Sequence, residues 1–241
     1  MLLYQSKSRP WRALELLAPL TPRDFANLTP DQRAELEPNF WESVCSEYDA
    51  ENLCLELERR RDAGAHYSEE FWSFEAVWRR DEMNHYVGFR RLYALTFGRS
   101  EDDIEAEMRQ RAADFSAFGE FLEDEFKLCL MLAYDELATT RSYATDVPLY
   151  QSLGHPALAA WIERVRADEA MHYYNALRVC QTRHHDRLPE AATLVRRVLA
   201  LDLTDTDYRA TFILDHKGPS YSPAILTAVA DTLCNVIARQ G

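Results

Sequence analysis

The chain has 241 residues, of which 47% are hydrophobic and 12% aromatic, so it is long and apolar enough to bury one sizeable core. Its net charge of −13 argues against a nucleic-acid partner, because phosphate binding depends on clustered Lys and Arg. No apolar run approaches the roughly 20 residues of a membrane-spanning helix, and the five cysteines, none in C-x-x-C spacing, argue against a disulfide framework or a zinc knuckle.

The distribution of proline predicts long helices after an irregular N-terminal segment. Five of the ten prolines fall in residues 1–38 and none in 39–147, and proline breaks helix interiors. The first residues lack the basic segment and long apolar stretch of a secretory signal, so we expect a cytoplasmic protein with no membrane partner.

The first two long helices are marked by their ends. Residues 39–63 carry apolar side chains at spacings that gather on one helical face, and Gly64 suits the position just past the helix end. Ser68 is a natural N-cap for the second helix, which Gly98 ends. Together these segments predict a helical hairpin.

A connecting helix and a third long helix follow. The acidic run after Ser100 favours a helix start, because the helix dipole stabilises negative charge in the first turn, and we expect this helix to run to about Gly119. The third long helix spans about 120–145 and ends before Pro148.

Pro156 suits the first turn of a fourth long helix, which runs to about residue 184. Amphipathic segments over about 189–201 and 223–239 predict two further helices, joined by a connection in which residues 215–219 form a loop. With no linker in the chain, we predict a single domain over residues 1–241, with a bundle at about 40–184 and C-terminal helices at about 189–239.

One motif occurs twice on the predicted long helices. Glu82 and His85 recur as Glu169 and His172, each pair three residues apart and therefore on one helix face about one turn apart. A carboxylate and an imidazole in this arrangement can reach the same metal ion. A single Glu-x-x-His is a weak signal, but two inward-facing copies on different helices predict a metal site.

The helical phase of the first copy supports a buried position. Glu82 and His85 point the same way as Phe71, Trp78 and Phe89, so they lie on the apolar side of their helix. Burying an unpaired carboxylate costs several kcal/mol, and a cation would remove that cost.

A di-metal carboxylate site in a four-helix bundle also takes one Glu from each of the other two helices. Glu136 fits on the third helix by its phase. On the first helix, Glu51 lies closer to the centre of the apolar face, whereas Glu47 leaves the hairpin more symmetric about Gly64; Glu47 is preferred and Glu51 stays open. Glu42 falls on the opposite face, where we expect it to be solvated.

Three segments together resemble the metal-binding helices of the ferritin-like di-iron oxygenases, particularly the soluble acyl-carrier-protein desaturases. They are Trp78-Arg-Arg-Asp-Glu-Met-Asn-His85, Val165-Arg-Ala-Asp-Glu-Ala-Met-His172 and Glu136-Leu-Ala-Thr139. The Glu-Tyr step at Glu47 is similar to one in bacterial multicomponent monooxygenases. The resemblance covers about residues 40–180.

This resemblance implies an all-α, ferritin-like four-helix bundle with additional N- and C-terminal helices. It implies two Fe ions, with Mn an alternative in one or both sites, and O2 as co-substrate. We therefore expect an oxidoreductase that hydroxylates, desaturates or N-oxygenates a small organic substrate with electrons from an external donor. Thr139 would assist proton delivery, unless its hydroxyl bonds back to a helix carbonyl.

Departures from the desaturase pattern limit what carries over. The chain is shorter, the spacing between the first two ligands differs, and no counterpart of the carrier docking surface is evident, so the chemistry is expected to carry over rather than the substrate. The alternatives are a ferritin-type iron-oxidising or storage protein, a metal-dependent radical subunit and a non-enzymatic helical interaction protein. A homodimer stays open. His216 is interpreted as an ordinary loop histidine, with a position at the mouth of a pocket as the alternative.

Overall fold

The protein is built from α-helices. The computed structural model describes residues 11–204, 208–217 and 219–239, and within those ranges it contains helices and short 3₁₀ turns but no β-strand, which confirms the predicted all-α class. The four long helices are α2 (Pro30–Asp62), α3 (Glu69–Phe97), α6 (Glu125–Ser152) and α7 (Pro156–Arg183). The first ten residues, in which the sequence predicts no secretory signal, lie outside the described ranges, as does Gly218 of the predicted loop.

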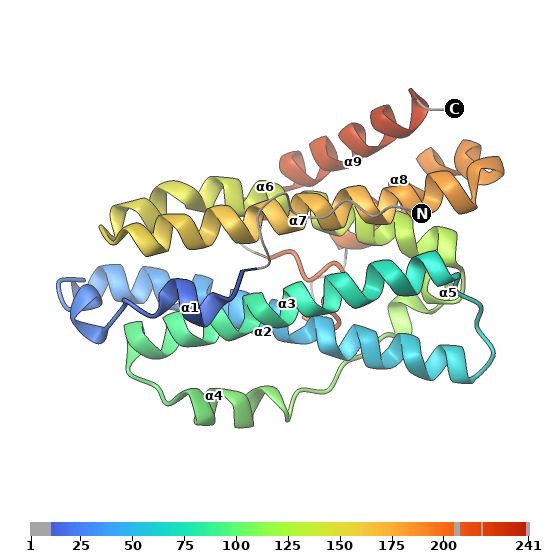
Figure 1. Ribbon diagram of the computed structural model, residues 1–241. Coiled ribbons are helices and arrows are strands. Elements are labelled where there is room, and N and C mark those ends of the chain that lie inside the picture. The colour runs from blue at the N-terminus through green and yellow to red at the C-terminus, as the bar shows by residue number, and fades with distance from the viewer. Residues whose placement is uncertain (1–10, 205–207, 218, 240–241) are drawn as a thin grey trace.

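The four long helices form two hairpins that pack into a bundle. Helices α2 and α3 lie side by side, as do α6 and α7, and Figure 1 shows the two hairpins one above the other. Helix α3 also packs against α7. The two helices that carry the Glu-x-x-His motifs are therefore neighbours across the interface between the hairpins.

Several helix ends lie where the sequence predicts them. Gly64 follows α2 with a φ of 106°, and Gly98 caps α3 in the left-handed region with a φ of 74°. The Ser68 side chain accepts a hydrogen bond from the backbone N–H of Phe71 and so caps α3. Pro156 stands in the first turn of α7.

Helix α2 begins earlier than predicted, at Pro30 instead of near residue 39. Thr29 forms a capping box with Gln32, which satisfies the first backbone N–H groups, and Pro30 suits the first turn. Pro38 therefore lies inside the helix, although an interior proline costs about 3 kcal/mol. Packing of the helix on its neighbours outweighs that local penalty.

Two further predicted ends are wrong. Helix α6 does not stop before Pro148 but continues through it to its end four residues later. The connecting helix is shorter than predicted, because α4 (Glu101–Met108) ends well before Gly119. Just beyond α4, Arg111 binds the buried carboxylate of Asp49 with its guanidinium, a long-range contact that draws the chain toward α2.

Shorter elements cover the bundle. The N-terminal α1 packs on α3 and α7, while α8 and α9 pack on each other and on α6. Additional helices from both ends of the chain therefore pack on the bundle, as predicted. These elements are α1 (Ala13–Leu17), η1 (Pro22–Phe25), η2 (Ser116–Phe118), α5 (Gly119–Leu122), η3 (His185–Glu190), α8 (Ala191–Thr204), η4 (Pro219–Tyr221) and α9 (Pro223–Ala238).

The bundle interior contains two hydrophobic clusters separated by a polar layer. On α3, Trp78 belongs to one cluster and Phe89 to the other, and Glu82 and His85 lie between them. The same division occurs on α7, where Val165 and Tyr173 fall in different clusters on either side of its motif. The apolar packing thus encloses the polar layer from both ends.

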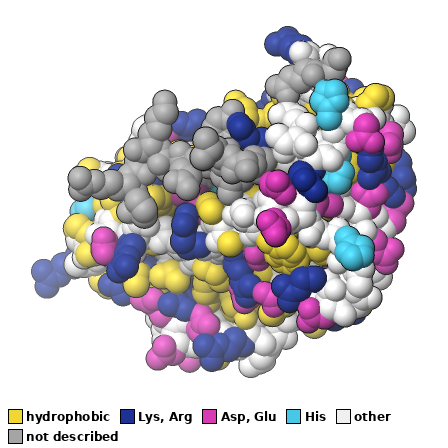
Figure 2. Space-filling view, turned by 45° about the vertical axis from the view of Figure 1, so that its right-hand side comes forward, with side chains coloured by type: hydrophobic (Ala, Val, Ile, Leu, Met, Phe, Trp, Pro, Cys, Tyr) yellow, Lys and Arg dark blue, Asp and Glu magenta, His cyan; other side chains and the backbone are white. Residues whose placement is uncertain are grey.

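The outer surface is charged and mixed. Figure 2 shows Lys and Arg side chains interspersed with Asp and Glu over the face that it presents. None of the helices among the described residues has the length and apolar character needed to cross a membrane.

Candidate metal centre

All six side chains that the sequence predicts as metal ligands meet inside the bundle, and each is at most 2% exposed. Helix α2 supplies Glu47, α3 supplies Glu82 and His85, α6 supplies Glu136, and α7 supplies Glu169 and His172. Their oxygen and nitrogen atoms form two groups of four side chains, within each of which the atoms lie within 4.8 Å of one another. Both groups contain Glu82 and Glu169.

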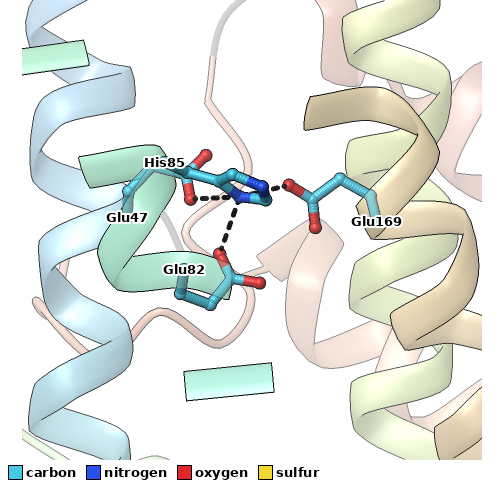
Figure 3. A group of neighbouring side chains, drawn as sticks. All are labelled: Glu47, Glu82, His85 and Glu169. Atoms are coloured by element: carbon cyan, nitrogen blue, oxygen red, sulfur yellow. Dashed lines mark ion pairs between the residues drawn. The ribbon is translucent and has the colours of Figure 1, made fainter. Parts of the chain in front are cut away.

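The first group surrounds His85. Figure 3 shows three carboxylates from three helices directed at this imidazole. Nδ1 of His85 lies 3.3 Å from Oε2 of Glu47, 3.5 Å from Oε2 of Glu82 and 3.2 Å from Oε1 of Glu169. These four side chains could hold one metal ion.

The second group surrounds His172. Its Nδ1 lies 2.9 Å from Oε1 of Glu82, 3.1 Å from Oε2 of Glu169 and 3.5 Å from Oε2 of Glu136. Glu82 and Glu169 thus each present one oxygen to His85 and the other to His172. Side chains placed in this way could contribute to two metal ions, with Glu47 and Glu136 each belonging to one group only.

Two aspartates that the sequence analysis did not single out hold the histidines from behind. Oδ2 of Asp168 lies 3.3 Å from Nε2 of His85, and Oδ2 of Asp81 lies 3.5 Å from Nε2 of His172. Each aspartate immediately precedes the motif glutamate of the opposite helix. Such carboxylate–histidine pairs fix the tautomer and ring orientation of a metal-ligating imidazole. The repeated Asp-Glu step was the available sequence signal.

Aromatic side chains anchor the outer carboxylates. The indole N–H of Trp78 donates to Oε1 of Glu136 at 2.6 Å, and the hydroxyl of Tyr143 donates to Oε1 of Glu47. Trp11, N-terminal to α1, donates its indole N–H to Asp168 at 2.8 Å. These bonds leave the other oxygens of Glu47 and Glu136 directed at the cluster.

Burial and crowding of like charges dominate the electrostatics. Burial, followed by the charge of a neighbouring glutamate, raises the pKa of both Glu47 and Glu136 well above the ordinary value. Burial opposes protonation of His85 and His172, but the surrounding carboxylates overcome it and raise the pKa of both imidazoles. Two divalent ions would replace the protons that such a cluster otherwise retains.

The donor set fits two divalent cations. Buried side-chain atoms without a hydrogen-bond partner include Oε2 of Glu47, both carboxylate oxygens of Glu82, Nδ1 of His85, Oε2 of Glu136 and Oε1 of Glu169. Leaving one such atom unpaired costs about 1–3 kcal/mol. Four carboxylates balance the charge of two divalent ions when both imidazoles are neutral. A mixed oxygen and nitrogen set without thiolate suits iron or manganese.

The structure separates Glu47 from its sequence alternative, Glu51. Glu51 is half-buried outside the cluster, where its carboxylate accepts a 2.8 Å hydrogen bond from Nε of Arg79. Thr139 lies one turn beyond Glu136, and its side chain is hydrogen-bonded to Tyr221. Bonding back to the helix, the other role considered for Thr139, belongs instead to Thr140, whose hydroxyl donates to the Glu136 carbonyl at 2.7 Å.

A cavity of about 470 Å³ lies beside the cluster, bounded by α2, α6 and residues 212–217 and 220–221. Thr139 and Tyr143 line it, so the Tyr143 hydroxyl that binds Glu47 belongs to a side chain shared by the cavity and the cluster. One sequence interpretation is wrong here: Glu42 is half-buried in the cavity wall instead of solvated. His216 lies in a loop, as predicted, but it is buried and lines the cavity, which was the alternative left for it.

No protein-family model, curated protein or solved structure matches this chain. The geometry of the cluster and the cavity is therefore the basis for inferring its function.

Proposed function

We propose that this protein is a ferritin-like, non-haem dinuclear-iron oxidoreductase that uses O2 to hydroxylate, desaturate or N-oxygenate a small organic substrate. One observation carries the proposal: two Glu-x-x-His pairs and two further glutamates converge as overlapping four-residue groups beside a cavity of about 470 Å³. That volume is in the range of small-molecule sites, about 300–1,000 Å³. Mn in one or both positions is the alternative metal content.

The residues divide into three roles. Glu82 and Glu169 would bridge the ions, Glu47 and His85 would complete one site, and Glu136 and His172 would complete the other. When bound and reduced, the iron pair supplies the electrons that activate O2. The hydrophobic clusters on both sides exclude water, which protects a reactive site from side reactions.

Tyr143 and Thr139 are placed to handle protons at the boundary with the cavity. The Tyr143 hydroxyl carries its proton in a hydrogen bond to Oε1 of Glu47, one side chain away from bound substrate. Thr139 lines the same wall, and its side chain is hydrogen-bonded to Tyr221. Both side chains extend from α6, so each would hold a hydroxyl proton at a fixed place near a substrate in the cavity.

The reaction needs an external reductant. Hydroxylation of a C–H or N–H bond removes two electrons from the substrate and takes two from a donor, so that one O2 oxygen enters the product and the other leaves as water. Desaturation removes two electrons and two protons from the substrate and takes two further electrons from the donor and two protons from solvent, so that both oxygens leave as water. An external electron donor is therefore part of the proposal.

A second candidate, a metal-dependent radical subunit, is favoured by one specific observation. Tyr143 hydrogen-bonds directly to a predicted ligand, Glu47, and a tyrosine close to the metals is what a stored radical requires. The cavity favours the oxygenase, because a radical-storing or iron-storing protein has no need of a substrate chamber beside its metals.

The first test is metal content. Anaerobic reconstitution with ferrous iron should give close to two irons per chain by elemental analysis. Glu47→Gln should lower this stoichiometry, whereas Glu51→Gln, four residues along the same helix and paired with Arg79, should not. Metal content near zero in the wild-type protein would exclude the proposal.

The second test is O2 uptake by the ferrous protein. We expect uptake to continue only while reductant is supplied and to be coupled to oxidation of an organic compound. Many irons oxidised per chain with formation of a mineral core would establish storage instead. A stable tyrosyl radical that disappears in Tyr143→Phe would establish the radical subunit.

A further inference from the structure

The cavity beside the cluster contains more negative than positive side chains. Glu42 comes from α2, Asp135 and Asp146 from α6, and Asp215 from the segment that closes the cavity, against His216 and Lys217 from that same segment. Between these groups lie apolar side chains such as Leu36, Leu149 and Phe212. A cavity of this kind suits an amphipathic ligand that carries positive charge.

Two of these carboxylates are not fully satisfied. Asp146 forms no hydrogen bond or ion pair with any residue that the structure describes. Oε1 of Glu42 is buried without a hydrogen-bond partner, although the backbone N–H of Lys217 donates to this carboxylate. Burial raises the pKa of Asp146 to about 6. Burial also raises the pKa of Glu42 to about 7, although the hydrogen bond from Lys217 and the charges of His216 and Lys217 oppose the rise. A bound cation would relieve both effects.

His216 gives an independent sign of a ligand. Its side chain is only 5% exposed, and its Nδ1 lies 2.9 Å from Oδ2 of Asp202, which also accepts a 2.7 Å hydrogen bond from Tyr134. His216 lines the cavity, and its Nε2 is buried without a hydrogen-bond partner, with Oδ1 of Asp135 at 3.5 Å. The imidazole is thus held in orientation through Nδ1, while Nε2 has no hydrogen bond in the cavity wall.

The proton on His216 decides what it can bind. Burial opposes the charged form, but Asp135 and Asp202 raise the pKa of the imidazole to about 9. Both ring nitrogens also face carboxylates, Nδ1 that of Asp202 and Nε2 that of Asp135, which favours a proton on each. Nε2 is then a hydrogen-bond donor and calls for an acceptor on the ligand.

We propose that the cavity binds a small amine that also carries a hydrogen-bond acceptor, with its ammonium group between Glu42 and Asp146 and its acceptor against Nε2 of His216. The binding site stands on the cavity geometry alone; that the amine is the compound oxidised rests on the proposed function. Among the reactions considered, this makes oxidation at the amine nitrogen or at a carbon near it the expected outcome.

Two matched ligand series test the proposal by calorimetric titration of the full chain. Tyramine is compared with para-ethylphenol, which lacks the amine, and with phloretate, in which a carboxylate replaces it; hexylamine is compared with hexanol and hexanoate. In at least one series the amine should bind tenfold or more tightly than both analogues. If no amine binds, or if an uncharged or carboxylate analogue binds as tightly, the proposal fails.

Variants assign the contacts. Glu42→Gln and Asp146→Asn should each weaken binding of the preferred amine about tenfold, as expected for loss of a charge-assisted hydrogen bond. His216→Phe should weaken tyramine and leave phenethylamine, which lacks the acceptor, unchanged. Glu163→Gln, on the exposed side of α7 where it pairs with Arg166, is the control. Equal losses in the control and cavity variants would refute the assignment.

Titrations with metal-free and iron-loaded protein separate the two proposals. Amine binding without metal uptake would refute the oxidoreductase and leave the amine site standing. Metal uptake without amine preference would refute the amine site and leave the oxidoreductase standing.

Discussion

Each ligand histidine uses its two ring nitrogens for different purposes. Nδ1 of His85 and of His172 points into the cluster, while Nε2 meets an aspartate from the other Glu-x-x-His helix. Asp168 and Asp81 therefore link α3 and α7 on both sides of the predicted metal ligands. An aspartate in this position strengthens the histidine as a ligand and fixes its ring.

Loss of this support should weaken metal binding without unfolding the protein. We expect Asp168→Asn to lower the affinity for ferrous iron about 10–100-fold, the usual effect of removing such a partner. Competition with a chromophoric chelator measures the affinity, and circular dichroism checks the fold. Asp62→Asn, at an exposed position, is the matched control. Unchanged affinity in Asp168→Asn would show that the contact serves only helix packing.

At the scale of single residues, local spacing predicts a ligand set but not its surroundings. The Glu-x-x-His pairs follow from one helix turn, and so they could be read directly. Glu47 and Glu51 share a helix face, and only the long-range partner of Glu51, Arg79, distinguishes them. The positions of Glu42 and His216 in one cavity depend on how α2 and the segment after α8 pack, which no local pattern encodes.

Asp146 makes stability depend on pH in a way that can be measured. Burial raises its pKa from 3.8 to about 6, so the folded protein binds this proton more tightly than the unfolded chain does. Ionisation of Asp146 therefore lowers the free energy of unfolding as the pH rises from 3.8 to about 6, and the full loss of stability applies above that pH. Asp146→Asn should raise the melting temperature by a few degrees at pH 7.5 and by much less at pH 4.5. An equal gain at both values would point to a cause other than charge.

At the scale of elements, caps were predictable and prolines were misleading. Ser68, Gly64 and Gly98 mark ends through local hydrogen bonds and backbone conformation, which act wherever those residues occur. Pro38 and Pro148 suggested breaks, yet both lie inside long helices whose packing outweighs the local cost. Tertiary contacts thus decide helix length in this bundle.

Gly88 is the element-scale feature with the clearest consequence. It lies on α3, facing α7, where a Cβ would stand 1.9 Å from the ring of Trp161. Gly88→Ala should therefore destabilise the fold by several kcal/mol, although alanine favours helix, because a rigid buried ring cannot yield. Denaturant unfolding measures the loss.

The matched control for that change is Gly119→Ala. No atom lies closer than 3.9 Å to a Cβ built there, so this variant should be neutral or slightly stabilising. Combining Gly88→Ala with Trp161→Leu, which removes the colliding ring, should cost less than the two single changes added together. Strict additivity would mean that the close approach is not what limits stability.

At the scale of the whole molecule, the chain segment that closes the cavity holds a strained shape. Ala210, Phe212 and Leu214 have φ values of 55°, 67° and 56°, a region that costs non-glycine residues about 1–3 kcal/mol each. The side chain of Asp135 accepts a 2.9 Å hydrogen bond from the backbone N–H of Leu214, which helps to hold the segment against α6. No glycine marks these positions, so this conformation could not be predicted from the sequence.

The metal-free bundle should be measurably less stable than the loaded one, because its centre buries four carboxylates whose charge the two histidines offset only in part. A ligand that binds only the folded state at 100 times its dissociation constant adds about 2.7 kcal/mol. With two sites, and a shift of about 2–4 °C per kcal/mol for a chain of this size, the melting temperature should rise on the order of 10 °C.

Calorimetry of chelator-treated protein, with and without ferrous iron under anaerobic conditions, tests this expectation. Glu136→Gln should separate the two parts of the argument. Burial and the charge of Glu169 raise the pKa of Glu136, so removing its charge should raise the melting temperature of the metal-free protein, while loss of a predicted ligand should abolish much of the rise on adding iron. Glu51→Gln should keep the full rise. If Glu136→Gln lowers the metal-free stability and keeps the rise, Glu136 is a structural ion-pair partner of His172 and the cluster is not a metal centre.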